Sequence, residues 1–186
     1  MKLRTFFLVI ATILLASCTN SRLELKSKSE LQELNQISPI GNAIGETAPD
    51  FTIITTDGRA VRLSSFAEQK KPVIVYFMAT WCPYCAEDYA ELSKVYPKYE
   101  KNVSFISIDL DLSEDILLLQ EYKKKYPELQ SSMFAPGQYR ILSDYQATKT
   151  TTKYAIGRDG KIIYAGFGAF DEQNWKDLLE KLSEGS

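Results

Sequence analysis

Two cysteines separated by two residues give the strongest chemical signal in the sequence. Cys82 and Cys85 lie in the run Trp-Cys-Pro-Tyr-Cys, between an apolar stretch and an amphipathic one. A cysteine at the start of a helix has its sulfur close to free backbone N–H groups and to the positive end of the helix dipole, and both favour the thiolate. Thiolate is the attacking species in disulfide exchange. The spacing therefore predicts a redox-active pair.

The positions within this motif suggest a role for each residue. Because the two cysteines are three residues apart, their sulfurs face the same side of a helix and can close a small ring. We expect Cys82, at the exposed end, to attack the sulfur of a partner, and Cys85, deeper in the helix, to resolve the mixed disulfide. Pro83 suits the first helical position, where its missing N–H costs nothing. Trp81 is expected to be a partly exposed aromatic that shields the cysteines.

Two other uses of a cysteine pair fit the sequence less well. A structural zinc site needs about four ligands, whereas the chain has no histidine and 3 cysteines in all. A purely structural disulfide that closes so short a loop would stabilise the fold little in the chain-entropy picture. We therefore expect no metal and no cofactor other than the redox-active Cys82–Cys85 disulfide.

The composition excludes several classes of function. The absence of histidine removes the Ser-His-Asp and Cys-His nucleophile systems. The chain has 22 basic and 24 acidic residues, and its net charge of −2 gives no electrostatic case for a nucleic-acid partner. A length of 186 residues, 45% of them hydrophobic, is enough for one domain with a substantial core.

The N-terminus has the features of an export signal. Lys2 and Arg4 precede an apolar stretch over residues 6–16, which is too short to span a bilayer as a stable helix. The stretch ends in Leu-Ala-Ser before Cys18, a pattern that resembles the bacterial lipobox. The resemblance implies cleavage before Cys18 and lipidation of its sulfur. An ordinary signal peptide cut near Ser17 is the alternative.

These features predict three parts of the chain. Residues 1–17 would be a signal peptide, residues 18–44 a lipid-anchored tether, and residues 45–186 a folded domain. Several acyl chains on one residue would hold the protein firmly to a membrane. We therefore expect a lipoprotein on the periplasmic face of the bacterial cell envelope, with the choice between inner and outer membrane open.

The segments around the cysteines predict the elements that hold them. Residues 73–78 (Val-Ile-Val-Tyr-Phe-Met) form an apolar run typical of a central strand buried on both faces. A helix should follow Cys82, with apolar residues at helical spacing up to Tyr99. Further strands are expected over 51–55, 60–63, 103–108, 152–156 and 161–167, and further helices near 64–66, 113–125 and 175–182. This order predicts an α/β fold, a mixed sheet with helices on both faces.

Five short motifs are distributed along residues 45–185. They are Gly-Glu-Thr-Ala-Pro-Asp-Phe at 45–51, Asp-Gly at 57–58, Leu-Ser-Ser-Phe at 63–66, Ala-Thr-Trp-Cys at 79–82 and Asp-Gly-Lys at 159–161. Together they resemble the TlpA/ResA-like proteins, which are membrane-tethered extracytoplasmic thiol–disulfide oxidoreductases. The resemblance implies a thioredoxin-like fold with an N-terminal β-hairpin extension and protein thiols and disulfides as substrates. The sequence leaves the direction of electron flow open: a reductant would be supplied by a membrane electron donor, and an oxidant or isomerase is the alternative. Family members commonly reduce specific partners, apocytochrome c among them, so cytochrome c maturation and envelope thiol homeostasis are both open roles.

Two positions depart from the family pattern. The family has a cis-proline opposite the cysteines, where this sequence has Thr151. A cis bond before a residue other than proline costs about 3–4 kcal/mol, so the Thr150–Thr151 peptide is either strained cis or relaxed trans. We expect this loop to line the site but to handle substrate differently. A carboxylate or amide usually stands at the position of Tyr76, whose neutral phenol is a poor proton acceptor near neutral pH.

Asp88, and the two residues between the cysteines, also invite comparison with known families. The family often has a glutamate three residues after the second cysteine, and here that residue is Asp88. It lies one helical turn from Cys85 and could accept its proton; a solvated surface acid is the competing interpretation. The pair formed by Pro83 and Tyr84 looks like that of glutaredoxins, which are shorter and lack the extension, so glutathione binding is not inferred.

Two other functions stay open on the sequence. A peroxiredoxin shares the Ala-Pro-Asp-Phe opening at 48–51, but it needs a threonine three residues before its peroxidatic cysteine and an arginine to activate peroxide. Thr80 is two residues before Cys82, and no arginine is clearly placed. A non-catalytic envelope adaptor with a degraded site would explain the lost proline and the lost strand carboxylate, but not the intact cysteine pair.

Overall fold

The computed structural model describes residues 38–185. All the elements below belong to one compact unit of the chain, Ile37–Ser186. The predicted signal peptide, the lipidation site Cys18 and residues 18–37 of the predicted tether lie outside the described residues. Within the described part, no helix is both long and apolar enough to cross a membrane.

A five-stranded mixed sheet in the order β5-β4-β3-β6-β7 forms the centre of the domain. Strand β3 (Val73–Met78) lies in the middle, parallel to β4 (Ser104–Asp109) and antiparallel to β6 (Thr152–Ile156). The edges are β5 (Met133–Ala135) and β7 (Ile162–Gly166). Every residue of β3 is buried, which confirms the prediction of a central strand with both faces covered.

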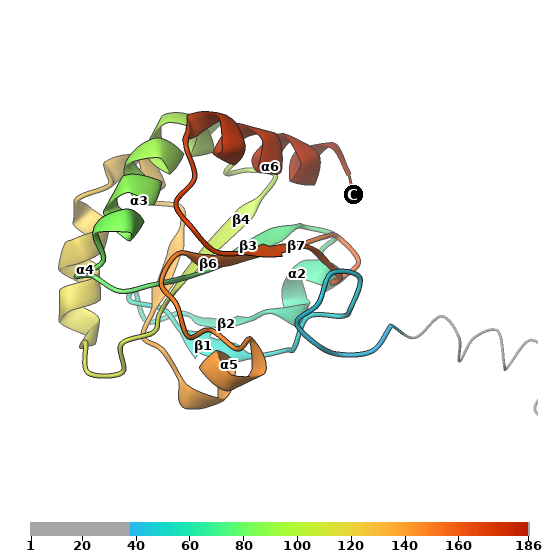
Figure 1. The fold of residues 1–186 in the computed structure, drawn as a ribbon, viewed down its shortest axis with the longest axis horizontal. Helices are drawn as coiled ribbons and strands as arrows, with labels where there is room; N and C mark the ends of the chain where they lie inside the picture. The colour runs from blue at the N-terminus through green and yellow to red at the C-terminus, as the bar shows by residue number, and fades with distance from the viewer. Residues whose placement is uncertain (1–37, 186) are drawn as a thin grey trace, which may run out of the picture. The chain divides into compact units, whose positions relative to one another are not determined.

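Helices cover both faces of the sheet, as predicted. Figure 1 shows α3 (Pro83–Val95) and α6 (Glu172–Glu184) over one face, with α4 (Ile116–Lys124) beside them. The short helices α2 (Ser64–Glu68) and α5 (Tyr139–Asp144) lie on the opposite side. The two resulting cores are separate, and the cysteines belong to the one under α3 and α6. Two single-turn 3₁₀ helices, Tyr96–Lys98 and Pro127–Leu129, follow α3 and α4.

The N-terminal hairpin of the prediction is present. Strand β1 (Thr52–Ile54) pairs antiparallel with β2 (Ala60–Arg62) through the turn at Asp57 and Gly58. The folded part extends further toward the N-terminus than the predicted boundary at Gly45. The N–H of Thr47 donates to the carbonyl of Pro39 at 2.8 Å, and the N–H of Gly45 donates to the carbonyl of Ile162 on β7 at 2.8 Å.

The sequence predicts Ser113, and either Ser64 or Ser65, as the capping residues of the helices near 113–125 and 64–66, and the structure corrects both. Helix α4 is capped by Asp115, whose Oδ1 accepts the N–H of Leu118 at 2.8 Å, and not by Ser113. The Ser113 hydroxyl instead donates to Asp111 at 2.6 Å, which closes a turn before the helix. Helix α2 has no side-chain cap, because its N-cap residue is Leu63, whose side chain has no polar atom. The Ser65 hydroxyl donates back to the carbonyl of Arg62. Strand β5 and helix α5 were not predicted, since both are too short to show a clear period.

Candidate active site

The two cysteines lie where β3 leads into α3. Cys82 is the N-cap residue of the helix, with an extended backbone, and Pro83 takes the first helical position. The Cys82 sulfur accepts the N–H of Cys85 at 3.1 Å. Both residues are free thiols, so this is the dithiol form of the pair. A backbone donor directed at Cys82 sulfur is the contact that stabilises a thiolate at a helix N-terminus.

The two sulfurs are less accessible than the motif suggested. Cys82 is 2% exposed and Cys85 is fully buried, and both belong to the core under α3. The expectation that Cys82 lies at an exposed end is therefore wrong for this form. The cause is that the Cys82 side chain packs into the core under α3, although the residues beside it at the start of the helix are exposed. The neighbours Trp81 and Tyr84 are each 62% exposed instead.

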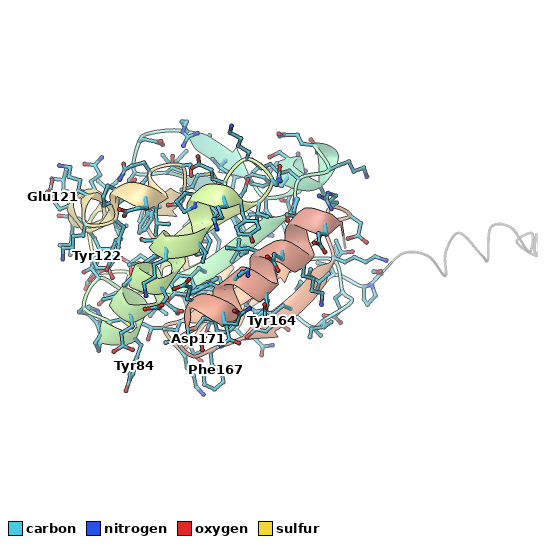
Figure 2. All side chains as sticks on the ribbon, turned by 90° about the horizontal axis from the view of Figure 1, so that it is seen from above. Tyr84, Glu121, Tyr122, Tyr164, Phe167 and Asp171 are labelled. Atoms are coloured by element: carbon cyan, nitrogen blue, oxygen red, sulfur yellow. The ribbon has the colours of Figure 1, made fainter. Side chains whose placement is uncertain are left out.

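The exposed aromatics frame the approach to the pair. The indole N–H of Trp81 donates to the carboxylate of Asp111 at 2.8 Å, which fixes the ring beside the β4–α4 loop. Trp81 is thus an exposed aromatic, as predicted. Figure 2 shows Tyr84 and Phe167 projecting from the same edge of the molecule. Phe167 is 64% exposed, and the Lys149 ammonium lies 4.1 Å from its ring centroid.

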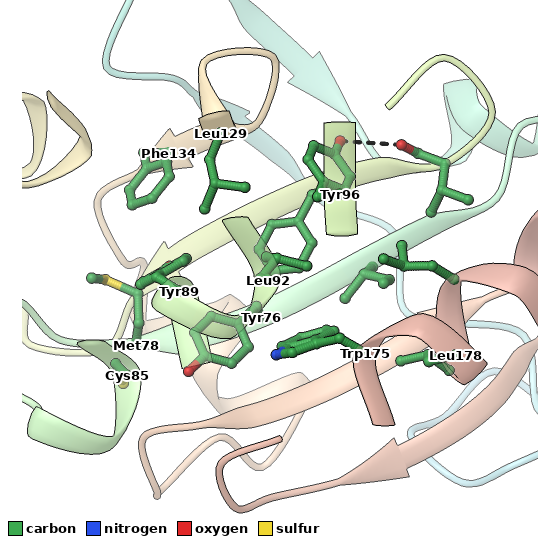
Figure 3. Close-up of a cluster of buried hydrophobic side chains, with 14 of the residues drawn as sticks. Tyr76, Met78, Cys85, Tyr89, Leu92, Tyr96, Leu129, Phe134, Trp175 and Leu178 are labelled. Carbon is green, nitrogen blue, oxygen red and sulfur yellow. Dashed lines mark hydrogen bonds between the residues drawn. The ribbon is translucent and has the colours of Figure 1, made fainter. Parts of the chain in front are cut away.

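Cys85 is held as a thiol. Burial is the main cause that raises its pKa, to about 12, and the neighbouring Cys82 raises it further. The hydroxyl of Tyr76 and the backbone of Ala79 act in the opposite direction by hydrogen bonding. Figure 3 shows the Tyr76 hydroxyl directed toward Cys85. A thiol with such a pKa is protonated at neutral pH, so Cys85 needs a base before it can attack.

A buried carboxylate lies next to this hydroxyl. Asp88 is 1% exposed, which excludes the interpretation as a solvated surface acid. Its Oδ2 accepts the Tyr76 hydroxyl at 2.8 Å. Its Oδ1 accepts the backbone N–H of Phe170 at 2.6 Å and the indole N–H of Trp175 on α6 at 3.1 Å. Burial nevertheless raises the pKa of Asp88, so this carboxylate is a better proton acceptor than an exposed one.

Lys153 completes this cluster. It lies on β6 directly opposite Tyr76 on β3, and its side chain is fully buried. The ammonium is 3.2 Å from Asp88 Oδ2 and also donates to the carbonyl of Gly168. Sequence analysis missed this residue. The available signal was a lysine inside a predicted strand whose other members are apolar or β-branched.

The Thr150–Thr151 peptide adopts the trans alternative, with a backbone shape at Thr151 that the sequence did not indicate. No cis peptide occurs between residues 38 and 185. The backbone of Thr151 is left-handed, with a φ of +63°, which is rare for a β-branched residue. The Thr151 hydroxyl holds this shape, because it donates to the carbonyl of Thr150 and accepts the N–H of Gly168 at 3.0 Å. The residue precedes β6 at the end of the sheet where β3 leads to the cysteines.

A second buried acid, Asp109, lies opposite Met78 at the end of β3, and Glu114 lies close to it. Glu114 accepts both the backbone N–H and the hydroxyl of Thr80. Asp109, at the end of β4, is fully buried; its Oδ1 accepts the N–H of Asp111, and its Oδ2 has no hydrogen-bond partner. Burial and Glu114 together raise the pKa of Asp109 to about 8.

Among residues 38–185, no group of three or more candidate side chains is arranged to hold a metal ion.

Comparisons with known proteins identify the relatives of this site. The model of the AhpC/TSA family matches residues 44–165. The chain belongs to this family. It is 28% identical over 141 residues to the thiol-disulfide oxidoreductase ResA of Bacillus thuringiensis subsp. konkukian, covering 75% of this chain and 79% of that protein. The ResA of Bacillus anthracis is 27% identical over 143 residues, with the same coverage of both chains.

Solved structures with a similar fold include proteins of the same kind as these relatives. A putative protein disulfide isomerase from Bacteroides thetaiotaomicron is 28% identical, with a TM-score of 0.64 over 77% of this chain and 89% of that one. A thiol:disulfide interchange protein of the thioredoxin family from Chlorobium tepidum has the same TM-score at 20% identity and shares the fold. The predicted thioredoxin-like fold and the resemblance to ResA-like oxidoreductases are therefore confirmed.

The arginines of the described residues do not support the peroxiredoxin alternative, which needs an arginine beside the cysteine that attacks peroxide. The described region has four arginines, and each has a partner away from the cysteines. These contacts are Arg59 with Asp57, Arg62 with Asp50, Arg140 with Asp144, and Arg158 with the carbonyl of Ser183. No described arginine is thus in contact with Cys82, where it would have to activate peroxide.

Proposed function

We propose that this chain is an extracytoplasmic thiol–disulfide oxidoreductase that exchanges disulfides with protein partners through Cys82 and Cys85. The observation that carries the proposal is the asymmetry of the pair. The sulfur of Cys82 accepts a backbone N–H at the start of α3, whereas Cys85 is a buried thiol with a carboxylate within reach through one hydroxyl. The names of the ResA relatives support the same reaction class.

The reaction has two sulfur transfers. The Cys82 thiolate attacks one sulfur of a partner disulfide; the partner's S–S bond breaks, and its other sulfur leaves as a thiolate that takes a proton from water. A mixed disulfide now joins Cys82 to the partner. Trp81 and Tyr84 offer exposed apolar surface on which the partner docks. The low exposure of Cys82 restricts the reaction to sulfurs that reach past these side chains.

Resolution of the mixed disulfide needs the proton of Cys85 to leave. Cys85 passes its proton to the Tyr76 oxygen as the Tyr76 hydroxyl passes its own to Asp88 Oδ2 at 2.8 Å. Tyr76 stays neutral, so its weakness as an acceptor does not matter. The Cys85 thiolate then attacks the Cys82 sulfur and releases the reduced partner. The partner gains two electrons, and the Cys82–Cys85 disulfide forms.

The proposal extends to location and electron supply. Lipid on Cys18 would anchor the protein to the bacterial envelope with the domain on its periplasmic face. A membrane electron donor would reduce the Cys82–Cys85 disulfide for the next cycle. The lipobox pattern at residues 15–18 and the relation to ResA proteins support this arrangement. A reductant of disulfides in apocytochrome c or in other envelope proteins is the role that fits.

Trapping separates this function from its alternatives. The full chain carrying Cys18→Ser and Cys85→Ser should accumulate a mixed disulfide with oxidised insulin, and mass spectrometry should locate it on Cys82. The matched variant carrying Cys18→Ser and Cys82→Ser should trap none, because Cys85 is buried and protonated. Absence of a Cys82 adduct, together with no reduction of insulin by the unmodified chain, would favour the adaptor. Rapid consumption of hydrogen peroxide by the reduced chain would favour the peroxiredoxin.

A further inference from the structure

We propose that Lys153 is a positioning residue that keeps Asp88 ionised and directed, through Tyr76, at Cys85, and so sets the pH range in which the mixed disulfide is resolved. The inference rests on the proposed function, because it concerns the second of the two sulfur transfers. It adds a residue from β6, remote in sequence from the cysteines, to a step otherwise carried out by β3 and α3.

The surroundings of the Lys153 ammonium are specific. A lysine is almost never fully buried unless it is paired, and here the whole side chain is buried among aromatic rings. Its nitrogen lies 4.1 Å from the ring centroid of Phe170 and 5.2 Å from that of Trp175. The carbonyl of Gly168 and the carboxylate of Asp88 each accept a hydrogen bond from this ammonium. The site is thus built for a cation.

The charge of Lys153 acts on Asp88 more than any other group does. A carboxylate taken out of water without a partner takes up a proton instead of staying charged. Burial raises the pKa of Asp88, and the Lys153 charge is the largest cause that opposes this rise. Reciprocally, burial lowers the pKa of Lys153, and Asp88 is the main cause that opposes that fall. Each residue keeps the other charged.

The same oxygen of Asp88 links Lys153 to the cysteines. Asp88 Oδ2 accepts both the Tyr76 hydroxyl and the Lys153 ammonium, so the charge lies on the atom that must receive the proton of Cys85. If Asp88 were already protonated, this oxygen could not accept another proton. Other titratable groups interact with Asp88 from the surrounding elements: Tyr76 on β3, Tyr89 on α3 and Tyr164 on β7. These are neutral phenols, so Lys153 supplies the positive charge in this group.

Lys153 could instead serve the fold alone. Its bond to the carbonyl of Gly168 ties down the loop that follows β7. A purely structural role predicts that its replacement lowers stability and leaves the chemistry of resolution unchanged. A positioning role predicts a shift in the pH dependence of one step only. The two roles are therefore separable by measuring both sulfur transfers across pH.

The test uses Ellman's reagent, 5,5′-dithiobis(2-nitrobenzoate), on the full chain carrying Cys18→Ser, so that the two site cysteines are the only thiols. Attack by Cys82 releases one coloured nitrothiolate, and attack by Cys85 releases a second. Stopped-flow absorbance from pH 5 to pH 10 gives the rate of each release. The variants are Lys153→Met, Lys153→Arg and Asp88→Asn. Lys161→Met, which removes a half-exposed surface lysine, is the matched control.

We expect Lys153→Met to leave the first release within about twofold of the parent. The second release should slow about tenfold or more at pH 7 and recover only at higher pH, because Asp88 now holds its proton to a higher pH. Lys153→Arg should restore much of the parent's pH profile. Asp88→Asn should slow the second release without recovery, and Lys161→Met should match the parent in both.

The outcomes separate the two proposals. A parent chain that gives no first release, or no second one, overturns the proposed function itself. A parent with two releases, together with a Lys153→Met second release that keeps the parent's pH profile, overturns the role of Lys153. If Lys153→Met does not fold, the double variant with Asp88→Asn removes both charges and should fold. It should resolve as slowly as Asp88→Asn, and resolution at the parent's rate would equally overturn the inference.

Discussion

Replacement of Asp109 by asparagine should make the domain more stable at alkaline pH. Asp109 is fully buried at the end of β4, and one of its carboxyl oxygens has no hydrogen-bond partner. Burial, with Glu114 close by, raises the pKa of Asp109 from 3.8 to about 8. Asparagine has the same shape and carries no charge. It can keep the bond from the N–H of Asp111, and its amide can donate toward Glu114.

The sign of the effect follows from proton binding. Between pH 4 and pH 8 the folded protein holds a proton on Asp109 that the unfolded chain has already lost, so the free energy of unfolding falls as the pH rises. The stabilisation is complete below the unfolded pKa and is lost once the pH passes the folded one. At about 1.36 kcal/mol per unit, a rise from 3.8 to about 8 sets an upper limit of about 6 kcal/mol. Because Glu114 can share the proton, we expect about half of this.

Urea unfolding of the parent, Asp109→Asn and Asp177→Asn at pH 5, 7 and 9 would measure the effect. Asp109→Asn should exceed the parent in free energy of unfolding by about 1 kcal/mol at pH 5 and by about 3 kcal/mol at pH 9. Asp177→Asn changes an exposed carboxyl and should follow the parent at every pH. Equal pH dependence in the parent and Asp109→Asn would refute the buried, protonated carboxyl.

Two further predictions concern Thr151 and Tyr76. Thr151→Pro should lower the free energy of unfolding by about 3 kcal/mol or more, because proline fixes φ near −65° whereas Thr151 has a φ of +63°. Heat unfolding would measure this loss, with Thr151→Gly as the control. Unchanged stability and activity in Thr151→Pro would contradict the left-handed conformation of the loop. Tyr76→Phe should cost about 1–3 kcal/mol of stability, because Asp88 loses one donor. It should also slow alkylation of Cys85 by iodoacetamide at pH 9 in a Cys82→Ser background, since the Tyr76 hydroxyl lowers the pKa of Cys85; equal alkylation rates would separate Tyr76 from the thiol.

The core of the site could be predicted because its signals are local. The apolar run at 73–78, the N-cap cysteine and Pro83 occupy consecutive segments, and each of these segments adopts the element that its own residues favour. The buried face of α6 was equally clear, because Trp175 and three leucines recur at helical spacing. Where a short segment gains its structure only from its neighbours, as β5 does beside β4, the sequence carries no comparable pattern.

The environment of the cysteines could not be predicted in the same way. Whether Asp88 faces water or the core depends on α6 and on the loop at 167–170, which lie far from it in sequence. The burial of Cys82 depends on the same packing. Lys153 was overlooked because a single lysine in a strand normally marks a surface position, and only the antiparallel register with β3 places it opposite Tyr76.

These contacts suggest why a tyrosine can stand where related proteins usually have a strand carboxylate or amide. A carboxylate on β3 at this position would lie opposite Lys153 and close to Asp88, so two acids would compete for one cation in the core. A neutral phenol avoids that second charge and still reaches both Cys85 and Asp88. The acid is supplied from α3, one turn after the cysteine that must lose its proton. With no acid at this position of β3, the Tyr76 hydroxyl links Cys85 to the buried carboxylate of Asp88 on α3.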